Sequence, residues 1–205
     1  NASGASIIGG GRIPRAGEIS LAHNGVLFLD ELPEFSRNIL EALRQPLEDG
    51  TVTVARAQAT YTFPANFILV ATMNPCQCGN FGSELECRCT PLQIQRYLGR
   101  VSGPLLDRMD MHVEVPRVKY NQLKDHTSGE SSQSMREKVS LAREIQQQRF
   151  ADDTINVNSQ MNTSKVQKYC RLDEESEMLL RNVFDKLKMS ARSYDRFLKV
   201  ARTIA

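Results

Sequence analysis

Residues 25–31 read Gly25-Val26-Leu27-Phe28-Leu29-Asp30-Glu31, a continuous apolar run that ends in two acidic residues. A run without polar interruptions predicts a strand that is buried on both faces, as in a parallel sheet. In open α/β sheets, ligands bind at the carboxyl ends of such strands. The stretch therefore predicts an α/β fold and puts two carboxylates where a ligand would bind.

The chain on either side of this stretch supplies the other elements of the α/β part. Apolar residues at helical spacing indicate helices, and alternation of apolar and polar residues indicates strands. We expect a glycine-rich loop or hairpin over residues 3–17, a helix over 36–47 with Ser36 as its N-cap, a β-hairpin over 51–63 with Arg56 at its basic tip, a buried strand over 67–72, a helix over 91–98 and a strand over 111–115.

The last third of the chain shows only helical patterns. Residues 119–134 are rich in Gln, Ser and charged residues and indicate a linker. Beyond the linker we expect helices over 135–150, 163–171, 173–188 and 191–205. The predicted domains are thus an α/β part over residues 1–118, the linker over 119–134, and a small helical domain over 135–205.

Composition excludes some classes of protein. The 205 residues carry a net charge of only +2, which by itself does not argue for binding to nucleic acid. The chain contains no apolar run of the roughly 20 residues that cross a bilayer, and its N-terminus lacks the features of a signal peptide. We therefore expect a cytoplasmic protein without contact to a membrane. The first residues, Asn1-Ala2, lack an initiator Met and suggest an excised segment.

The first two candidate site features follow the two buried strands. Of Asp30 and Glu31, one carboxylate can hold Mg²⁺ through water and the other can polarise a water for attack on a phosphate. Asn74, just beyond the strand over 67–72, could orient that water. The plainer alternatives are a solvated acidic turn at Asp30 and a turn that begins at Asn74 because Pro75 follows.

Two arginines form the other candidate features. Arg108 lies just before the predicted strand over 111–115 and could stabilise a phosphoryl group on a neighbouring subunit, or it could pair with Asp107 or Asp110. Arg192 lies in the first turn of the last helix, where the helix dipole disfavours a cation, and this conflict hints at a function. The alternative for Arg192 is an ordinary exposed arginine.

Four of the five cysteines form a cluster of two Cys-x-Cys pairs that eight residues separate. Zinc is held by four thiolates in a tetrahedron, so Cys76, Cys78, Cys87 and Cys89 are a candidate zinc site. The alternatives are free thiols in a loose loop or a disulfide formed in air. The fifth, Cys170, lies in an apolar helical context and is expected in the core. His23 and His112 have no partner at ligand spacing and are left out of any site.

These features, in this order, resemble the AAA+ module of magnesium-chelatase subunit I and, more closely, the ComM-type magnesium-chelatase-like AAA+ ATPases. The resemblance rests on residues 17–31, Asn74-Pro75-Cys76, residues 102–110 and residues 190–205. It implies a partial AAA+ core followed by an α-helical lid. It further implies Asp30 and Glu31 as the Walker B pair, Asn74 as sensor 1, Arg108 as the arginine finger, Arg192 as sensor 2, and residues 51–63 as the pre-sensor-1 hairpin that faces a central pore.

One departure from the family pattern concerns the phosphate-binding loop. The chain contains no Gly-x-x-x-x-Gly-Lys-Ser/Thr motif, which in the family lies upstream of Walker B. We therefore expect a C-terminal fragment of the module whose own binding of ATP is weak or absent, so that the fragment alone is inactive.

The resemblance implies a ring ATPase, by analogy a hexamer, that uses ATP and Mg²⁺ to move on single-stranded or branched DNA in transformation or recombination. Arg56 would contact DNA phosphates there, unless it is only a solvated hairpin tip. ComM-type sequences resemble this one in the four-cysteine insertion, which is the candidate Zn²⁺ site. Two alternatives stay open: an ATPase subunit that inserts Mg²⁺ into a porphyrin, and a non-catalytic interaction module.

Overall fold

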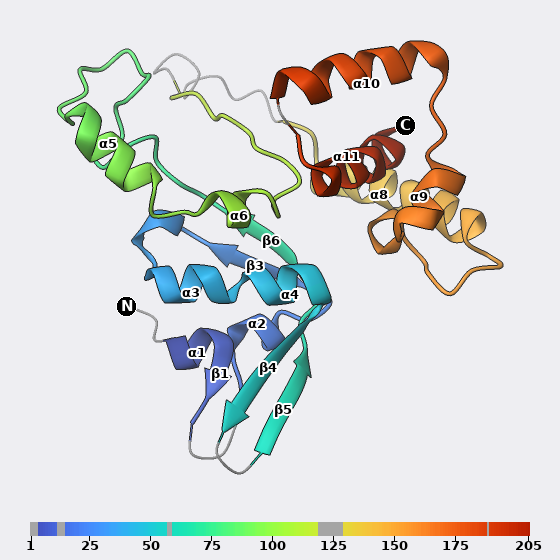
Figure 1. The fold of residues 1–205 in the computed structure, drawn as a ribbon, viewed down its shortest axis with the longest axis horizontal. Coiled ribbons are helices and arrows are strands. Elements are labelled where there is room, and N and C mark those ends of the chain that lie inside the picture. The colour runs from blue at the N-terminus through green and yellow to red at the C-terminus, as the bar shows by residue number, and fades with distance from the viewer. Residues whose placement is uncertain (1–3, 12–14, 57–58, 119–128, 188) are drawn as a thin grey trace. The chain divides into compact units, whose positions relative to one another are not determined.

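The computed structural model describes residues 4–11, 15–56, 59–118, 129–187 and 189–205. The chain separates into two compact units, Asn1–Arg117 and Val118–Ala205, whose helices and strands are drawn in Figure 1. Each unit has its own hydrophobic core. Among the described helices, none is both long and apolar enough to cross a membrane.

The first unit mixes short helices with three small two-stranded sheets. Its elements, in chain order, are α1 (Gly4–Ile8), β1 (Gly9–Gly10), β2 (Arg15–Ala16), α2 (Glu18–Leu21), β3 (Val26–Leu29), a 3-10 turn at Leu32–Glu34, α3 (Arg37–Ala42), α4 (Arg44–Asp49), β4 (Thr51–Arg56), β5 (Ala59–Pro64), β6 (Ile68–Ala71), α5 (Pro91–Leu98) and α6 (Gly103–Leu106).

The two predicted buried strands pair with each other. Strands β3 and β6 run parallel, with Val26 opposite Ile68 and Leu29 opposite Ala71. The prediction of a parallel sheet is confirmed, but burial on both faces is wrong for this chain. Leu27 and Leu29 are buried, whereas Val26 and Phe28 are more than half exposed, because only one face of the pair packs on the core.

The predicted hairpin is present as the antiparallel pair β4 and β5, in which Thr51 lies opposite Pro64 and Arg56 opposite Ala59. Alternation decides which face is buried: Val52 and Val54 lie in the interior of the unit. The predicted basic tip of this hairpin lies outside the described part of the chain, which leaves out residues 57–58 and the side chain of Arg56.

The segment predicted as one helix over 36–47 forms two. Ser36 is the N-cap residue of α3, as predicted, and the chain turns at Leu43 into α4, which ends at Gly50 in the left-handed conformation. The bend lets Leu40 and Leu43 point into the same core, where both are at most 1% exposed. The buried side chains of this core are Ile7, Ile19, Leu27, Leu29, Leu32, Ile39, Leu40, Leu43, Val52, Ala65, Val101 and Leu105.

The glycine-rich start forms a helical turn followed by a short antiparallel pair, in which Gly9 lies opposite Ala16. The glycines are required by close backbone approach. A Cβ at Gly17 would collide with the backbone of Gly9 and Ile7, and Gly9 itself has φ +105°. The predicted hairpin is thus found in part, while residues 12–14 lie outside the described chain.

The strand predicted over 111–115 is wrong. These residues have no regular secondary structure, and Met111, Val113 and Val115 are at least 70% exposed. Alternation alone does not make a strand, because backbone N–H and C=O groups also need a neighbouring strand as partner.

The second unit is helical, as predicted. Its elements are α8 (Ser132–Arg149), a 3-10 turn at Asn158–Gln160, α9 (Thr163–Tyr169), α10 (Glu174–Leu187) and α11 (Ala191–Ile204). The buried side chains of its core are Phe150, Met161, Val166, Cys170, Leu180 and Leu198, so the prediction of a buried Cys170 is confirmed.

The start of α8 lies inside the segment predicted as a linker. Ser131 caps this helix by accepting a hydrogen bond from the Ser134 amide (3.2 Å), so the last residues of the predicted linker are helical. Residues 119–128 of that segment lie outside the described chain.

Candidate functional site

The acidic pair lies at the carboxyl end of β3, next to the end of β6. Because Leu29 pairs with Ala71, the residues that follow them, Asp30 and Thr72, come side by side. The Thr72 hydroxyl donates a hydrogen bond to Asp30 Oδ1 and accepts one from the Glu31 amide (3.1 Å). One hydroxyl therefore fixes the side chain of Asp30 and the backbone of Glu31.

Glu31 adopts the left-handed conformation, with φ 53° and ψ 53°. This conformation costs a residue with a Cβ roughly 1–2 kcal/mol. It is held by Thr72, whose carbonyl also accepts from the Leu32 amide (2.9 Å). Strain of this kind in a non-glycine residue concentrates at functional sites, where the surrounding contacts over-determine the backbone.

Asn74 lies two residues beyond Thr72 and is exposed. Its backbone N–H donates to the hydroxyl of Tyr97, a residue of α5 that is 6% exposed. Burial raises the pKa of Tyr97, the carboxylates of Glu34 and Glu31 raise it further, and the Asn74 hydrogen bond opposes them. Because β3 and β6 run parallel with Leu29 opposite Ala71, Glu31 and Asn74 both lie beyond the same end of the strand pair.

Arg108 lies just beyond α6 with a side chain that is only 9% exposed. It forms an ion pair with Glu48 of α4 and donates to the Pro104 carbonyl (2.6 Å). The predicted partners were Asp107 or Asp110, so Glu48 is a partner that the sequence did not indicate. An arginine finger at this position would have to exchange Glu48 for the phosphate of a neighbouring subunit, and this role stays a prediction.

Arg192 lies in the first turn of α11, which Ser190 caps, and its side chain is exposed. It lines a hollow of about 1180 Å³ among α9, α10 and α11. Thr163, Glu177 and Arg181 line the same hollow. Arg192 belongs to the second unit and the acidic pair to the first, so a joint role of these residues stays a prediction.

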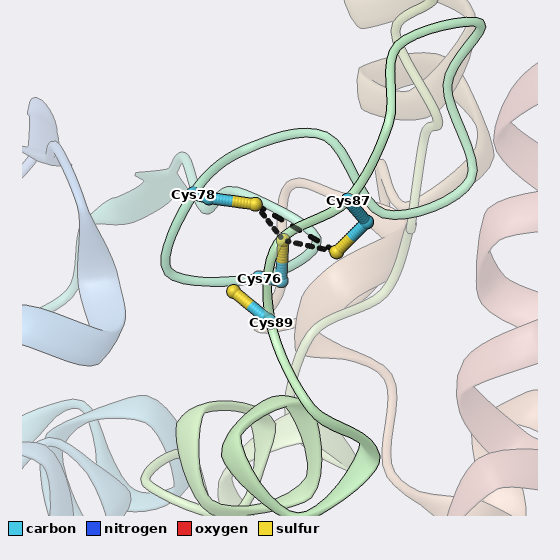
Figure 2. Close-up of side chains that lie close together, drawn as sticks. All are labelled: Cys76, Cys78, Cys87 and Cys89. Carbon is cyan, nitrogen blue, oxygen red and sulfur yellow. Dashed lines mark hydrogen bonds between the residues drawn. The ribbon is translucent and has the colours of Figure 1, made fainter.

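The four cysteines of the predicted metal site come together (Figure 2). We call Cys76, Cys78, Cys87 and Cys89 the cysteine group. Three of the Sγ–Sγ distances are 3.4 Å, from Cys76 to Cys78, and 3.7 Å, from Cys87 to each of Cys76 and Cys78. All four Sγ atoms lie within 4.8 Å of one another, and none of the four cysteines is disulfide-bonded in the structure.

Backbone N–H groups surround these sulfurs. The Phe81 amide donates to Cys76 Sγ (3.4 Å), and hydrogen bonds from the amides of Asn80 and then Arg88, with a further one from Cys76, lower the pKa of Cys78 to about 6. Because the thiolate is the form that binds metals, Cys78 is poised as a ligand at neutral pH. The cysteine group can hold a metal ion.

The pKa of Cys87 is shifted in the other direction. The hydrogen bond from the Cys89 amide lowers its pKa, but burial and the neighbouring Cys78 and Cys76 outweigh that bond and raise the pKa to about 11. Crowded thiols oppose the loss of further protons because like charges repel, and a bound cation would remove this opposition.

Thr72 is the site residue that sequence reasoning missed. A signal was available, since Thr72 follows β6 just as Asp30 follows β3. His23, which the sequence analysis left out of any site, accepts a hydrogen bond at Nδ1 from the Asn66 amide (3.1 Å) and so links two loops.

Two family models match the chain. Magnesium chelatase, subunit ChlI, matches residues 1–123, and Magnesium chelatase, subunit ChlI C-terminal, matches residues 129–205. Competence protein ComM of Haemophilus influenzae is 48% identical over 206 residues, which cover 100% of this chain. An uncharacterized protein of Escherichia coli is 46% identical over the same length, and magnesium-chelatase subunit ChlI of Cyanophora paradoxa is 26% identical over 148 residues, or 71% of this chain and 37% of that one.

The chain spans only part of these relatives. It covers 40% of the Haemophilus influenzae protein and 40% of the Escherichia coli protein.

Proposed function

The chain belongs to the magnesium-chelatase-like family, in its ComM type, and on that premise we propose that it is part of an AAA+ ATPase that couples ATP hydrolysis to DNA remodelling. The ATPase activity in this proposal is supported by the arrangement of side chains at the carboxyl end of the parallel strand pair. There Asp30 and Glu31 lie beside Thr72, and Asn74 follows at the same end.

The donor set at this end fits a nucleotide with its metal. Exposed carboxylate oxygens are the ligands that Mg²⁺ prefers, and Mg²⁺ bound with ATP would neutralise charge on the phosphates. In the proposal Asp30 holds Mg²⁺ and Glu31 accepts a proton from the attacking water. Asn74 orients that water, and Arg108 and Arg192 act on the phosphates, with Arg108 serving a neighbouring subunit.

Hydrolysis needs a phosphate-binding loop that this chain does not contain. We propose that the loop belongs to another part of a longer protein, in keeping with relatives that are more than twice as long as the matched region. The 205 residues alone are then expected not to hydrolyse ATP.

The DNA half of the proposal draws on the relative named a competence protein and on hairpin β4–β5. In a ring of subunits, expected to be a hexamer, the hairpins would line a central pore, and Arg56 would contact the phosphates of single-stranded or branched DNA. Such a motor for transformation or recombination would work in the cytoplasm. The proposed cofactors are ATP and Mg²⁺, and Zn²⁺ is the metal ion that the cysteine group is proposed to bind.

The deciding experiment measures ATP hydrolysis by the full-length protein, with and without single-stranded and branched DNA. The motor predicts hydrolysis that DNA stimulates several-fold and that Glu31→Gln abolishes while ATP binding persists. Hydrolysis that ignores DNA would leave an ATPase with another substrate, such as the metal chelatase reaction. Absence of hydrolysis would favour a non-catalytic interaction module.

A further inference from the structure

We infer that a Zn²⁺ ion in the cysteine group is a brace that holds Asn74 in place, a role that rests on the function proposed above for Asn74. The four sulfurs lie within 4.8 Å of one another, and the segment that carries them is held by a few local hydrogen bonds and buries almost no apolar surface.

The spacing of the sulfurs matches a tetrahedron around zinc. Zn–S bonds of about 2.3 Å put the four sulfurs of such a tetrahedron about 3.8 Å apart. The distances from Cys87 to Cys76 and Cys78 are 3.7 Å each, Cys76 and Cys78 are 3.4 Å apart, and all four sulfurs lie within 4.8 Å of one another, so the group is close to this spacing. Disulfide-bonded sulfurs would lie about 2.05 Å apart. Four thiolates fill the coordination sphere, so the site is of the closed, structural kind.

The segment that carries the cysteines, residues 75–90, has no core of its own. Cys76 is its single buried residue, whereas Phe81 and Leu85 are nearly half exposed. Gly79 and Gly82 take positive φ values of 78° and 77° to bring the two Cys-x-Cys pairs back on each other. A segment that buries so little apolar surface cannot offset the entropy of ordering its backbone, and a metal is one of the few devices that can.

Both ends of this segment connect to the proposed active site. Asn74 lies two residues before Cys76, and its amide is hydrogen-bonded to Tyr97 of α5. At the other end, Cys89 is followed directly by Thr90, which caps α5 by accepting from the Gln93 amide (3.3 Å). The metal would therefore tie the end of β6 to the start of α5, and the position of Asn74 depends on both.

The test uses the full-length protein and three variants. Cys78→Ala removes an exposed ligand without leaving a core cavity, Cys78→His keeps a zinc-binding atom at the position, and Cys170→Ala is a matched control in the other core. The measurements are zinc per chain by mass spectrometry, hydrogen exchange of residues 73–90, and the kcat and KM of ATP hydrolysis.

We expect one zinc per chain in the unsubstituted protein and in Cys170→Ala. In Cys78→Ala zinc should fall at least tenfold, exchange of residues 73–90 should rise at least tenfold, and kcat should drop by up to about 100-fold, with a smaller change in KM, because a reacting group is misplaced. Cys78→His should restore part of each.

Two results would overturn the inference. Purified protein that contains no zinc, or iron instead, removes the metal. Zinc loss that leaves the exchange of residues 73–90 at the level of Cys170→Ala removes the brace. Metal content and exchange do not depend on ATP hydrolysis, so a failure of the proposed ATPase would be recognised separately from a failure of the brace.

Discussion

The left-handed backbone of Glu31 allows a prediction in which the usual ranking of two substitutions reverses. At most positions alanine is more stable than glycine by about 0.4–1 kcal/mol, because glycine has more freedom in the unfolded chain. At φ 53° and ψ 53°, a Cβ costs roughly 1–2 kcal/mol that glycine avoids. Glu31→Gly should therefore be more stable than Glu31→Ala by about 0.5–1 kcal/mol.

The free energy of unfolding is measurable by urea denaturation followed by circular dichroism, because the chain contains no tryptophan. With a slope of about 2 kcal/mol per molar urea, the midpoint of Glu31→Gly should exceed that of Glu31→Ala by about 0.3–0.5 M. Neither variant keeps the carboxylate, so both should be inactive in the full-length protein. Glu31→Gly would then be more stable than Glu31→Ala although both lack the proposed activity.

A higher midpoint for Glu31→Ala would refute this reasoning, because the backbone of residue 31 would then not be left-handed in solution. Equal midpoints would contradict the magnitude and indicate that the turn relaxes on substitution. Glu31→Gln, which keeps a Cβ, should show the same strain as the unsubstituted protein and serves as the control.

Three further predictions concern other parts of the chain. Thr72→Val should raise the Mg²⁺ concentration needed for half-maximal hydrolysis by the full-length protein while Thr72→Ser should not, because the hydroxyl orients the acidic pair; equal Mg²⁺ dependence would contradict this role. Leu43→Ala, at a side chain 0% exposed, should destabilise the first unit by about 2–5 kcal/mol in urea, whereas Leu21→Ala, at 70% exposure, should change stability by less than about 0.5 kcal/mol. The hydrogen bond from Lys165 lowers the pKa of Asp153, so the stability that this ion pair contributes is complete above about pH 4 and is lost as the pH falls through the folded pKa of Asp153. Asp153→Asn should therefore reduce the loss of stability in acid titrations followed by circular dichroism. An unchanged acid titration would contradict this role of Asp153.

Local patterns predicted most elements correctly because they depend on neighbours in sequence. The hairpin of β4 and β5, the helix α5 and the four helices among the described residues of the second unit follow from alternation or helical spacing in short windows. The failures also have a local cause. Residues 111–115 alternate like a strand but have no partner strand, and the helix over 36–47 bends at Leu43, where packing of the core decides the direction.

The features of the candidate site also fall into those that the sequence predicted and those that it missed. The sequence predicted that Asp30, Glu31 and Asn74 lie beyond the carboxyl ends of two buried strands, and β3 and β6 pair in parallel so that these ends are neighbours. Thr72 was missed because its bond to Asp30 spans 42 positions and depends on the parallel register of β3 and β6. The ion pair of Arg108 with Glu48 was missed for a similar reason, as Glu48 lies 60 positions away on α4.

The sequence by itself determined the family and most of the strands and helices, and it singled out the residues proposed to carry the chemistry, because these follow from periodicity, spacing and motif. Only the tertiary structure decided that Glu31 is strained, that one threonine holds both acidic residues, and that four cysteine sulfurs approach within 4.8 Å of one another. These features arise from contacts between residues far apart in the chain, and such contacts are set by the packing of a whole unit.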